Sequence, residues 1–441
     1  MLLCISILLL FFLIVIFINK KIEWYHFIWA LLPIDMYGLK LFGVTIKPYM
    51  IFGLVIIICS ISNFIIKARI NNNYVAVSRE NLHYRFVIFV CNMVIFFLML
   101  CSDIFNGATI GSLLQQFMWL FIVFIAYTYM CNVNQYGQWK NAYIAICTTT
   151  KVYISFFILS YLLITLFNNS DLLALSRFDS GLFIKFDNSN LERLRGYFID
   201  SNTLFTSLSI GVSALILNVI SAKRKISDYM WLALAVFIVY LTNSRNTLIN
   251  FLFIFIFLLL CYRPIRKMSI KNIMIVTGIL MVGLIIFSHI DIYSSVIEWY
   301  QVSYSEHSEL GAQYGRFSIW RNNLSIIKND LLFGMGQGLL RTVSYRDFHN
   351  TWFEVLGANG ILVTIFYMFP IFFVLHKYIK HRKKAIMLGN DSEKMYFSLI
   401  AGYIGVLISL STVSNINNSY LIFATFILSA GGDVLRGLDN V

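Results

Sequence analysis

The chain has 441 residues, of which 59% are hydrophobic and only 12% are charged. Soluble domains carry about a quarter charged residues, so this composition excludes an ordinary soluble protein, and the repeated apolar runs are typical of membrane-spanning helices. The net charge of +13 could suggest a nucleic-acid partner, but the basic residues follow the membrane topology described below, so we expect no nucleic acid to bind.

The apolar runs predict an all-α fold, a polytopic transmembrane helical bundle of about 12–13 spans that forms a single integral membrane domain over residues 1–441. A β-barrel is not expected, because the runs are continuous rather than alternating. The first run has no basic region or cleavage site, which favours a retained helix over a signal peptide. Residues 24–39 form the weakest span, because Pro33 and Asp35 interrupt it. The candidate spans are 2–18, 24–39, 48–66, 86–102, 113–131, 143–167, 200–221, 228–242, 246–261, 272–290, 350–376, 395–412 and 415–430.

The loops between these runs predict the orientation. Most lysines and arginines fall in one set of alternate loops, including 20–21, 67–85, 223–225, 263–271 and 377–394. Lysine and arginine accumulate on the cytoplasmic side of membrane proteins. We therefore expect a multi-pass protein of the bacterial cytoplasmic (inner) membrane, with the N-terminus outside and the C-terminus in the cytoplasm.

Two long polar segments lie on the predicted outer side, a first outer loop at 168–199 and a large outer (periplasmic) loop at 291–349. Residues 294–304 in the second loop could form a short interfacial helix. Residues 316–329 predict another helix, because Phe317, Trp320, Leu324 and Ile327 form one apolar stripe at helical spacing.

Arginines on this side are the first candidates for function. Arg245 lies at the edge of a span, where it could snorkel to the interface or bind a phosphate group. Arg195 lies just before another span and precedes Gly196, which allows a close approach of the backbone. The large loop adds three guanidinium groups suited to bidentate phosphate binding, although each alone could be a solvated loop charge: Arg316, Arg321 and Arg341.

A histidine and an asparagine follow the large loop. The imidazole of His349 could accept a proton from a hydroxyl, although a lone histidine is often structural. Asn350 can cap the helix that follows, and Trp352 could stack on a sugar ring or anchor the interface. The seven cysteines lie within or at the ends of apolar runs without a C-x-x-C motif, and no second histidine lies at metal spacing, so we expect no disulfide, no metal site and no cofactor.

These motifs, in this order, resemble the O-antigen ligase and O-antigen polymerase (Wzy-like) superfamily of bacterial inner-membrane proteins. The resemblance covers about residues 193–360 and departs from the family pattern at two points. The usual proline before the first loop glycine is absent, and Ala358 and Asn359 stand where an acidic residue usually precedes the distal glycine, which puts a catalytic role for that acid in doubt. The motifs that carry the resemblance are the segment 195–202 with Asn202, Ser244-Arg245, Arg316 to Trp320, Leu332 to Gly336, His349-Asn350, and Gly357 or Gly360. We interpret Gly334, Gly336 and Gly338 as a tight turn, because no strand precedes them and no Gly-Lys-Ser/Thr follows.

The resemblance implies a metal-independent membrane glycosyltransferase of GT-C-like architecture. It would transfer a glycan from undecaprenyl diphosphate to a sugar hydroxyl at the outer face of the membrane. His349 would act as the base or orient the acceptor, and Arg245 and Arg316 would stabilise the diphosphate. Secondary substrate contacts would come from Arg195, Asn202, Arg321, Arg341, Asn350 and Trp352.

The sequence favours a polymerase of lipid-linked repeat units, for O-antigen or capsule, over a ligase that joins the polymer to lipid A-core. A lipid-linked oligosaccharide flippase is a further alternative, but it predicts symmetric halves and short loops. The expected partners are the undecaprenyl-diphosphate-linked glycan and membrane lipids, together with a chain-length regulator and a flippase.

Overall fold

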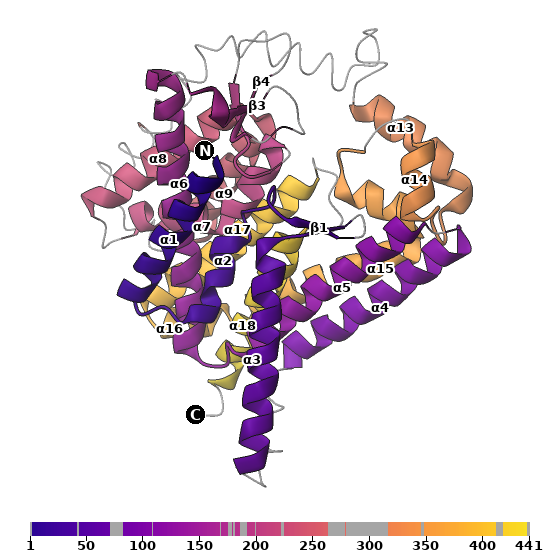
Figure 1. The fold of residues 1–441 in the computed structure, drawn as a ribbon. Helices are drawn as coiled ribbons and strands as arrows, with labels where there is room; N and C mark the ends of the chain where they lie inside the picture. The colour runs from indigo at the N-terminus through magenta and orange to yellow at the C-terminus, as the bar shows by residue number, and fades with distance from the viewer. Residues whose placement is uncertain are drawn as a thin grey trace.

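The computed structural model describes residues 2–262, Gly278 and 316–438, apart from gaps at 42–43, 71–82, 108, 168, 175–178, 180, 186–191, 199, 222–224, 345–347 and 412–417. The described chain is a bundle of packed helices (Figure 1). The predicted all-α, polytopic class is therefore confirmed. Nine helices in these ranges are long and apolar enough to cross a membrane: α1 (Leu2–Asn19), α3 (Pro48–Ile70), α4 (His83–Phe105), α5 (Ile110–Cys131), α6 (Tyr136–Phe167), α7 (Ser201–Ile220), α15 (Thr351–Lys380), α17 (Asn390–Leu410) and α18 (Ser419–Gly437).

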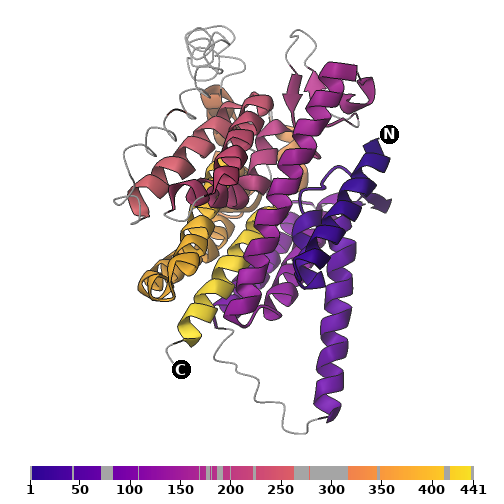
Figure 2. The ribbon, with the colours of Figure 1, turned by 90° about the vertical axis from the view of Figure 1, so that its left-hand side faces the viewer.

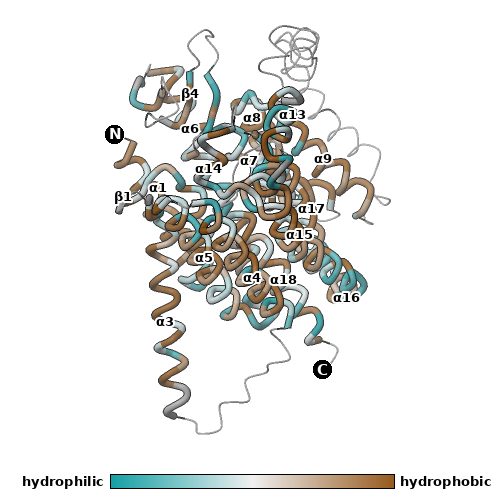
Figure 3. Tube along the Cα trace, turned by 90° about the vertical axis from the view of Figure 1, so that its right-hand side faces the viewer, coloured by the Kyte–Doolittle hydropathy of each residue, from teal (hydrophilic) through white to brown (hydrophobic). Residues whose placement is uncertain are grey.

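Two shorter apolar helices, α8 (Ile226–Thr242) and α9 (Arg245–Cys261), match the predicted spans 228–242 and 246–261. A short polar helix, α16 (Arg382–Met387), joins α15 to α17. Hydrophobic residues cover most of the bundle, whereas α16 and part of α13 (Arg316–Ile327) are hydrophilic (Figure 3). In the view of Figure 2, α3 extends well below its neighbours.

The expected span over residues 24–39 is wrong. This segment contains a short 3-10 helix, η1 (Trp24–Phe27), and a single turn of α-helix, α2 (Ile28–Leu31). Pro33 cannot donate the backbone hydrogen bond that would continue the helix. The chain then forms an antiparallel pair of strands, β1 (Leu39–Leu41) and β2 (Val44–Ile46). The expected span 272–290 and the expected interfacial helix 294–304 lie outside the described residues.

The first outer segment contains a small sheet that the sequence did not predict. A 3-10 turn, η4 (Ser170–Leu172), leads into β3 (Leu173–Ala174), which pairs with β4 (Phe183–Lys185), and β4 pairs in turn with β5 (Glu192–Leu194). Gly196 follows with a positive φ of 60°, and a Cβ there would lie 2.9 Å from atoms of Phe157 and Leu204. The expected close approach of the backbone at Gly196 is therefore confirmed.

Among the described candidate membrane spans, α7 and α18 are the most enclosed, and α7 packs closely along α17. The Ser213 hydroxyl donates to the Ser398 carbonyl at 2.6 Å, and a Cβ on Gly402 would lie 2.3 Å from the Cα of Ile210. Small residues let membrane helices approach closely and form hydrogen bonds between them. Further along α17, Asn250 of α9 donates to the Gly405 carbonyl at 2.7 Å.

A buried ion pair joins three other helices. The Nε of Arg85, at the start of α4, lies 2.9 Å from a carboxylate oxygen of Asp433 in α18, and both side chains are fully buried. Arg85 also donates to the carbonyls of Met130 and Val133 at the end of α5. Asp433 also accepts the backbone N–H of Tyr84 at 2.9 Å. This N–H lies in the first turn of α4, where backbone N–H groups have no acceptor within the helix.

Helix α15 breaks at Gly360, where φ is 76° and ψ is 179°. The loop that contains Gly334 and Gly336 pairs with this break, through Met335 N–H to the Gly357 carbonyl at 3.0 Å, Gly336 N–H to the Ala358 carbonyl at 2.8 Å, and Ile361 N–H to the Leu331 carbonyl at 2.8 Å. We call this arrangement of residues 331–336 and 357–361 the glycine clasp. Gly334 and Gly336 both have positive φ, which confirms the tight turn expected from the glycine motif.

The glycine clasp is anchored to the end of α4. Ser102 donates to the Phe333 carbonyl at 2.6 Å, and Asp103 accepts the backbone N–H of Gln337 at 2.7 Å. Gln337 begins α14 (Gln337–Val343), whereas α13 and the 3-10 turn η6 (Lys328–Asp330) precede the clasp. The clasp therefore fixes the α13–α14 segment against α4 and the first half of α15.

Candidate functional site

The ends of four helices meet in one region, which we call the outer junction after the side on which the sequence predicts it to lie: the amino ends of α7, α9 and α15 and the carboxyl end of α17. Helices α7 and α17 run in opposite directions, since Ser213 contacts Ser398 and Ile210 contacts Gly402. Both helices have the same rise per residue, so these contacts also fix the relative height of their ends. Ser201, the first residue of α7, therefore lies at the level of Ser411, directly after α17.

Helix α9 reaches the same level. Asn250 donates to the Ser409 hydroxyl near the end of α17 at 2.6 Å, and Ser244, the cap of α9, lies about 1.7 turns before Asn250. The Ser244 hydroxyl donates to the Asn202 side-chain oxygen at 2.5 Å, which joins the amino end of α9 directly to that of α7. Asp200 accepts the Asn202 backbone N–H and caps α7.

This contact brings together two predicted site positions, Asn202 and Arg245. Arg245 is the first residue of α9, directly after Ser244, and its side chain lies outside the described part of the structure. The amide of Asn202 is held by both carboxylate oxygens of Asp200, at 3.0 and 2.9 Å. Asn202 therefore has a fixed orientation beside the first turn of α9.

The start of α15 is attached to the same junction. The Trp352 indole N–H donates to the Ser411 hydroxyl at 3.1 Å, and the Trp352 ring packs edge-on against Tyr367. Asn350 accepts the backbone N–H groups of Trp352 and Phe353, which confirms it as the cap of α15. His349 is half-buried and has a φ of 48°, a conformation that costs free energy and that His, Asn and Asp tolerate better than most residues.

Helix α13 packs against the start of α15. The Trp320 indole N–H donates to the Phe348 carbonyl at 2.8 Å, and the Trp320 ring lies edge-on to Phe353 with centroids 5.2 Å apart. The predicted helix with an apolar stripe is thus confirmed, and Trp320 contacts the residue that precedes His349. Arg316 begins α13 one turn before Trp320, and its side chain lies outside the described part of the structure. Arg321 is exposed on α13.

Two other predicted arginines have different surroundings. Arg195 is fully buried, and its guanidinium donates to the carbonyls of Asp179 and Gly181 (2.9 Å to the latter) in the first outer segment. Burial lowers the pKa of Arg195, Asp179 opposes this change, and the group remains charged. Arg341 belongs to α14, which packs between α5 and α15, and its side chain lies outside the described residues.

Two residues that the sequence did not single out lie beside Arg245. Asn246 and Thr247 are buried in the first turn of α9, and within the described residues neither the Asn246 amide nor the Thr247 hydroxyl has a hydrogen-bond partner. Buried polar groups are normally satisfied, so unpartnered groups at a helix amino end suit a site that receives a polar ligand. The signal in the sequence was the short polar run 243–247 between two apolar runs.

The outer junction can stabilise negative charge. Three helix amino ends, each with a partial positive charge, meet where Arg245 begins α9 and near the start of α13, where Arg316 lies. In the described part of the chain, no three His, Cys, Asp or Glu side chains lie together as metal ligands would.

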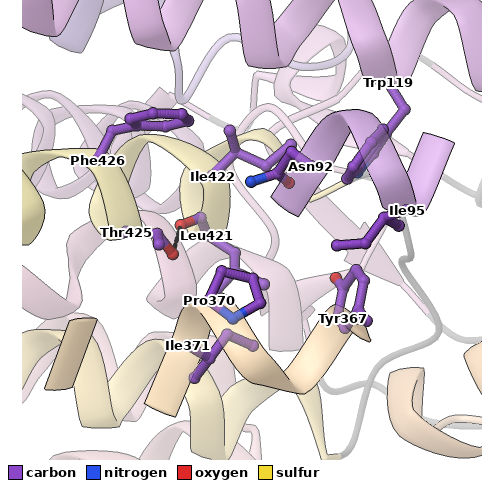
Figure 4. A pocket seen from close by; sticks show the side chains of 10 residues that line it. All are labelled: Asn92, Ile95, Trp119, Tyr367, Pro370, Ile371, Leu421, Ile422, Thr425 and Phe426. Atoms are coloured by element: carbon purple, nitrogen blue, oxygen red, sulfur yellow. Dashed lines mark hydrogen bonds between the residues drawn. The ribbon is translucent and has the colours of Figure 1, made fainter. Parts of the chain in front are cut away.

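A separate, small apolar pocket lies between α4, α5, α15 and α18 (Figure 4). Ile95, Trp119 and Phe426 line it together with Pro370, and Asn92 and Thr425 add the side-chain amide and hydroxyl in its wall. It contains no charged residue, so we do not consider it a site for a diphosphate.

Part of the chain is similar to a known protein family. Residues 230–368 match the model of the family described as O-antigen ligase. This range contains Arg245, Arg316 and His349 but not Arg195 or Asn202. A comparison with curated proteins finds no match. The family match makes residues 230–368 similar to the O-antigen ligase family, and it supports an activity of the O-antigen ligase and polymerase type.

Proposed function

We propose that the protein is a polymerase of lipid-linked polysaccharide repeat units. It transfers a growing glycan from undecaprenyl diphosphate to a sugar hydroxyl of the next lipid-linked unit, at the outer face of the bacterial cytoplasmic membrane. The observation that carries this proposal is the outer junction, where the amino ends of α7, α9 and α15 meet at the carboxyl end of α17. A diphosphate leaving group needs positive charge that is already in place, and helix amino ends together with arginines provide it.

In this proposal Arg245 and Arg316 bind the diphosphate, with Asn202 and Asn246 as polar neighbours. His349 accepts the proton from the attacking hydroxyl or orients that hydroxyl. Its position, next to the cap of α15 and to the Phe348 carbonyl that receives Trp320, holds the imidazole where α13 and α15 meet. Asn350 and Trp352 then act mainly by fixing this end of α15.

The remaining predicted residues have weaker support as substrate contacts. Arg195 holds backbone carbonyls of the first outer segment, so we assign it a positioning role. Arg321 and Arg341 stay secondary contacts, together with the large outer loop to which they belong. We further propose that the reaction needs no metal ion, that the architecture is GT-C-like, and that the N-terminus lies outside and the C-terminus in the cytoplasm.

One observation favours a second candidate function. The matched family is described as O-antigen ligase, so transfer of finished polymer to a lipid A-core acceptor is the alternative. The two reactions share the donor and the diphosphate leaving group and differ only in the acceptor.

A deletion strain distinguishes these functions. Loss of a polymerase leaves single repeat units on the surface glycan, whereas loss of a ligase leaves no surface glycan and accumulates lipid-linked polymer. Complementation with His349→Asn tests the site, because asparagine tolerates the positive φ of this position while the imidazole is removed. We expect the variant to be inserted at the wild-type level and to produce no polymer. Restoration of full-length polymer by this variant would rule out His349 as the base.

A further inference from the structure

Two lysines away from the outer junction meet on the surface of α6. Lys20 directly follows α1, and its ammonium group donates to the Thr148 hydroxyl of α6 at 2.9 Å. Lys151 belongs to α6 itself and follows Thr148 by three residues, a spacing at which side chains are neighbours on the helix surface. We call Lys20 and Lys151 the lysine pair. Helices α1 and α8 both pack against α6 (Figure 1).

The lysine pair faces outward from the bundle. Lys20 is exposed and Lys151 is half-buried. Ser155 and Leu159 follow Lys151 at intervals of four residues, and both are exposed, so Lys151 begins an outward-facing stripe of α6. On a membrane-spanning helix such a stripe contacts lipid. Any group that binds the lysine pair therefore approaches from the surrounding lipid and not from inside the protein.

The lysine pair lies near the level at which α1 leaves the apolar part of the membrane. Helix α1 is apolar along its length and ends one residue before Lys20. The hydrogen bond from Lys20 places Thr148 close to this level, and Lys151 is about one turn deeper. A lysine at such a depth extends its ammonium group towards the headgroups. The Lys151 ammonium lies 5.3 Å from the centre of the Trp231 ring in α8, and tryptophan is typical of the headgroup level.

The lysine pair has positive charge without a carboxylate partner. Among the residues that the structure describes, no Asp or Glu oxygen lies within ion-pair distance of either ammonium group. Burial and the charge of Lys151 lower the pKa of Lys20, whereas Cys147 opposes the change. The two cations therefore repel each other at a depth where an unpaired charge is unfavourable. A negative group that contacts both ammonium groups relieves both effects.

The surroundings indicate which negative group fits. A phosphate presents several acceptor oxygens, and lysine binds phosphate as a compact point charge. The exposed stripe of α6 continues from Lys151 through the apolar side chains of Leu159, Leu162 and Leu166, along which acyl chains can lie. A soluble anion has no such contact and has to leave water to reach Lys151. Basic sites between membrane helices are suited to anionic lipid headgroups.

We propose that the lysine pair binds the phosphate group of an anionic phospholipid whose acyl chains lie along the exposed stripe of α6. The site lies towards the opposite membrane face from the outer junction. Trp231 precedes Thr242, the last residue of α8, by about three turns or roughly 16 Å, and the chain then reaches Ser244 of the junction. The inference does not depend on the proposed function, because the two sites share no residue.

Native mass spectrometry of the purified full-length protein in detergent measures the binding of single lipids. The probes are phosphatidylglycerol, which is anionic, and phosphatidylcholine, which has no net charge. Lys20→Gln and Lys151→Gln each remove one positive charge, whereas Lys151→Arg keeps it. The matched control is Lys383→Gln, which removes the same charge from an exposed position on α16.

We expect Lys20→Gln and Lys151→Gln each to raise the Kd of the tightest-bound phosphatidylglycerol about fivefold, and the double variant to raise it about twentyfold. Binding of phosphatidylcholine should not change, and Lys151→Arg and Lys383→Gln should bind both lipids as the wild type does. Thr148→Val should raise the Kd of phosphatidylglycerol about two- to threefold without a change in charge, because Lys20 loses the hydroxyl that positions it. Thermal unfolding of each variant in the same detergent ensures that a loss of binding does not come from a loss of fold.

The contrary outcomes are equally specific. An equal loss of phosphatidylglycerol binding in Lys383→Gln would indicate a general effect of net charge and overturn the site, as would unchanged binding in the double variant. Inorganic phosphate at millimolar concentration distinguishes a lipid from a free anion. If it displaces phosphatidylglycerol from the wild-type protein, the lipid assignment is wrong. Lysine-dependent lipid binding in a protein without transferase activity would support the lipid site and contradict only the proposed function.

Discussion

The glycine clasp gives the sharpest structural prediction, at Gly360. A Cβ at this position would lie 2.4 Å from the Leu332 carbonyl oxygen and 2.6 Å from the Gly334 nitrogen. The φ of 76° and ψ of 179° also belong to a region that only glycine occupies without strain. Gly360→Ala should therefore open the clasp while leaving the two halves of α15 helical.

The magnitude follows from the contacts that would be lost. Backbone strain costs about 1–3 kcal/mol, and each of the three backbone hydrogen bonds of the clasp contributes about 0.5–1.5 kcal/mol. The closed clasp should thus lose about 2.5–7.5 kcal/mol. A factor of ten corresponds to about 1.4 kcal/mol, so the equilibrium constant for local opening should rise by about 10²–10⁵.

Hydrogen–deuterium exchange of the purified protein measures this opening directly. The amides of Met335, Gly336 and Ile361 should exchange faster in the Gly360→Ala variant, whereas amides in α7 should not change. The control is Gly137→Ala in α6, where a Cβ would meet nothing within 4 Å and alanine favours the helix. Unchanged exchange in the 331–336 segment of Gly360→Ala would refute the clasp, and so would an equal increase in Gly137→Ala.

Three further changes test other parts of the account. Arg85→Met should lower the stability of the bundle by about 3–5 kcal/mol, because it leaves Asp433 charged and buried, and the double change with Asp433→Leu should recover part of that loss in thermal unfolding. Asn202→Ala and Ser244→Ala should lower kcat/KM by less together than the sum of their separate effects, with a coupling of about 0.5–1.5 kcal/mol, and strict additivity would contradict the link between α7 and α9. Arg195→Met should speed amide exchange in β4 and raise its protease sensitivity, whereas an unchanged sheet with a higher substrate KM would point to direct substrate contact.

Local patterns predicted local structure well. The apolar stripe of 316–329 gave α13, Asn350 was recognised as a helix cap, and the glycines marked a turn. Each of these features depends on residues within one or two turns of the chain. The sequence also left the distal glycine open between two positions. The structure identifies Gly360 by its positive φ, whereas Gly357 stays within regular helix.

Long-range pairing could not be predicted in the same way. The glycine clasp consists of backbone hydrogen bonds between 331–336 and 357–361, and these carry no side-chain signature of their partner. The packing of α7 along α17 relies on small residues such as Gly402. A small residue indicates that another helix packs closely at that position, but it does not indicate which helix. The wrong prediction of a span at 24–39 has a simpler cause. The prediction gave more weight to the hydrophobicity of the segment than to Pro33, which prevents the helix from continuing.

The candidate site was predicted in part. The sequence motifs selected Asn202, Arg245 and His349, and the structure brings the helix ends that bear them to the outer junction. Arg195 looked similar to the other arginines, but its guanidinium is enclosed and holds backbone carbonyls. Burial of a single polar side chain depends on the tertiary fold, so a motif alone does not distinguish an arginine that binds substrate from one that holds a loop.

The most direct test of the central claim is a transfer reaction with purified components. The protein in nanodiscs is given a synthetic undecaprenyl-diphosphate-linked repeat unit in the presence of a metal chelator, and the release of undecaprenyl diphosphate and the glycan length are measured. We predict that the wild-type protein releases undecaprenyl diphosphate and extends the glycan, and that Arg245→Met and His349→Asn variants with normal thermal unfolding do neither. Undiminished release by both variants, or no release by the wild-type protein with or without the chelator, would contradict it.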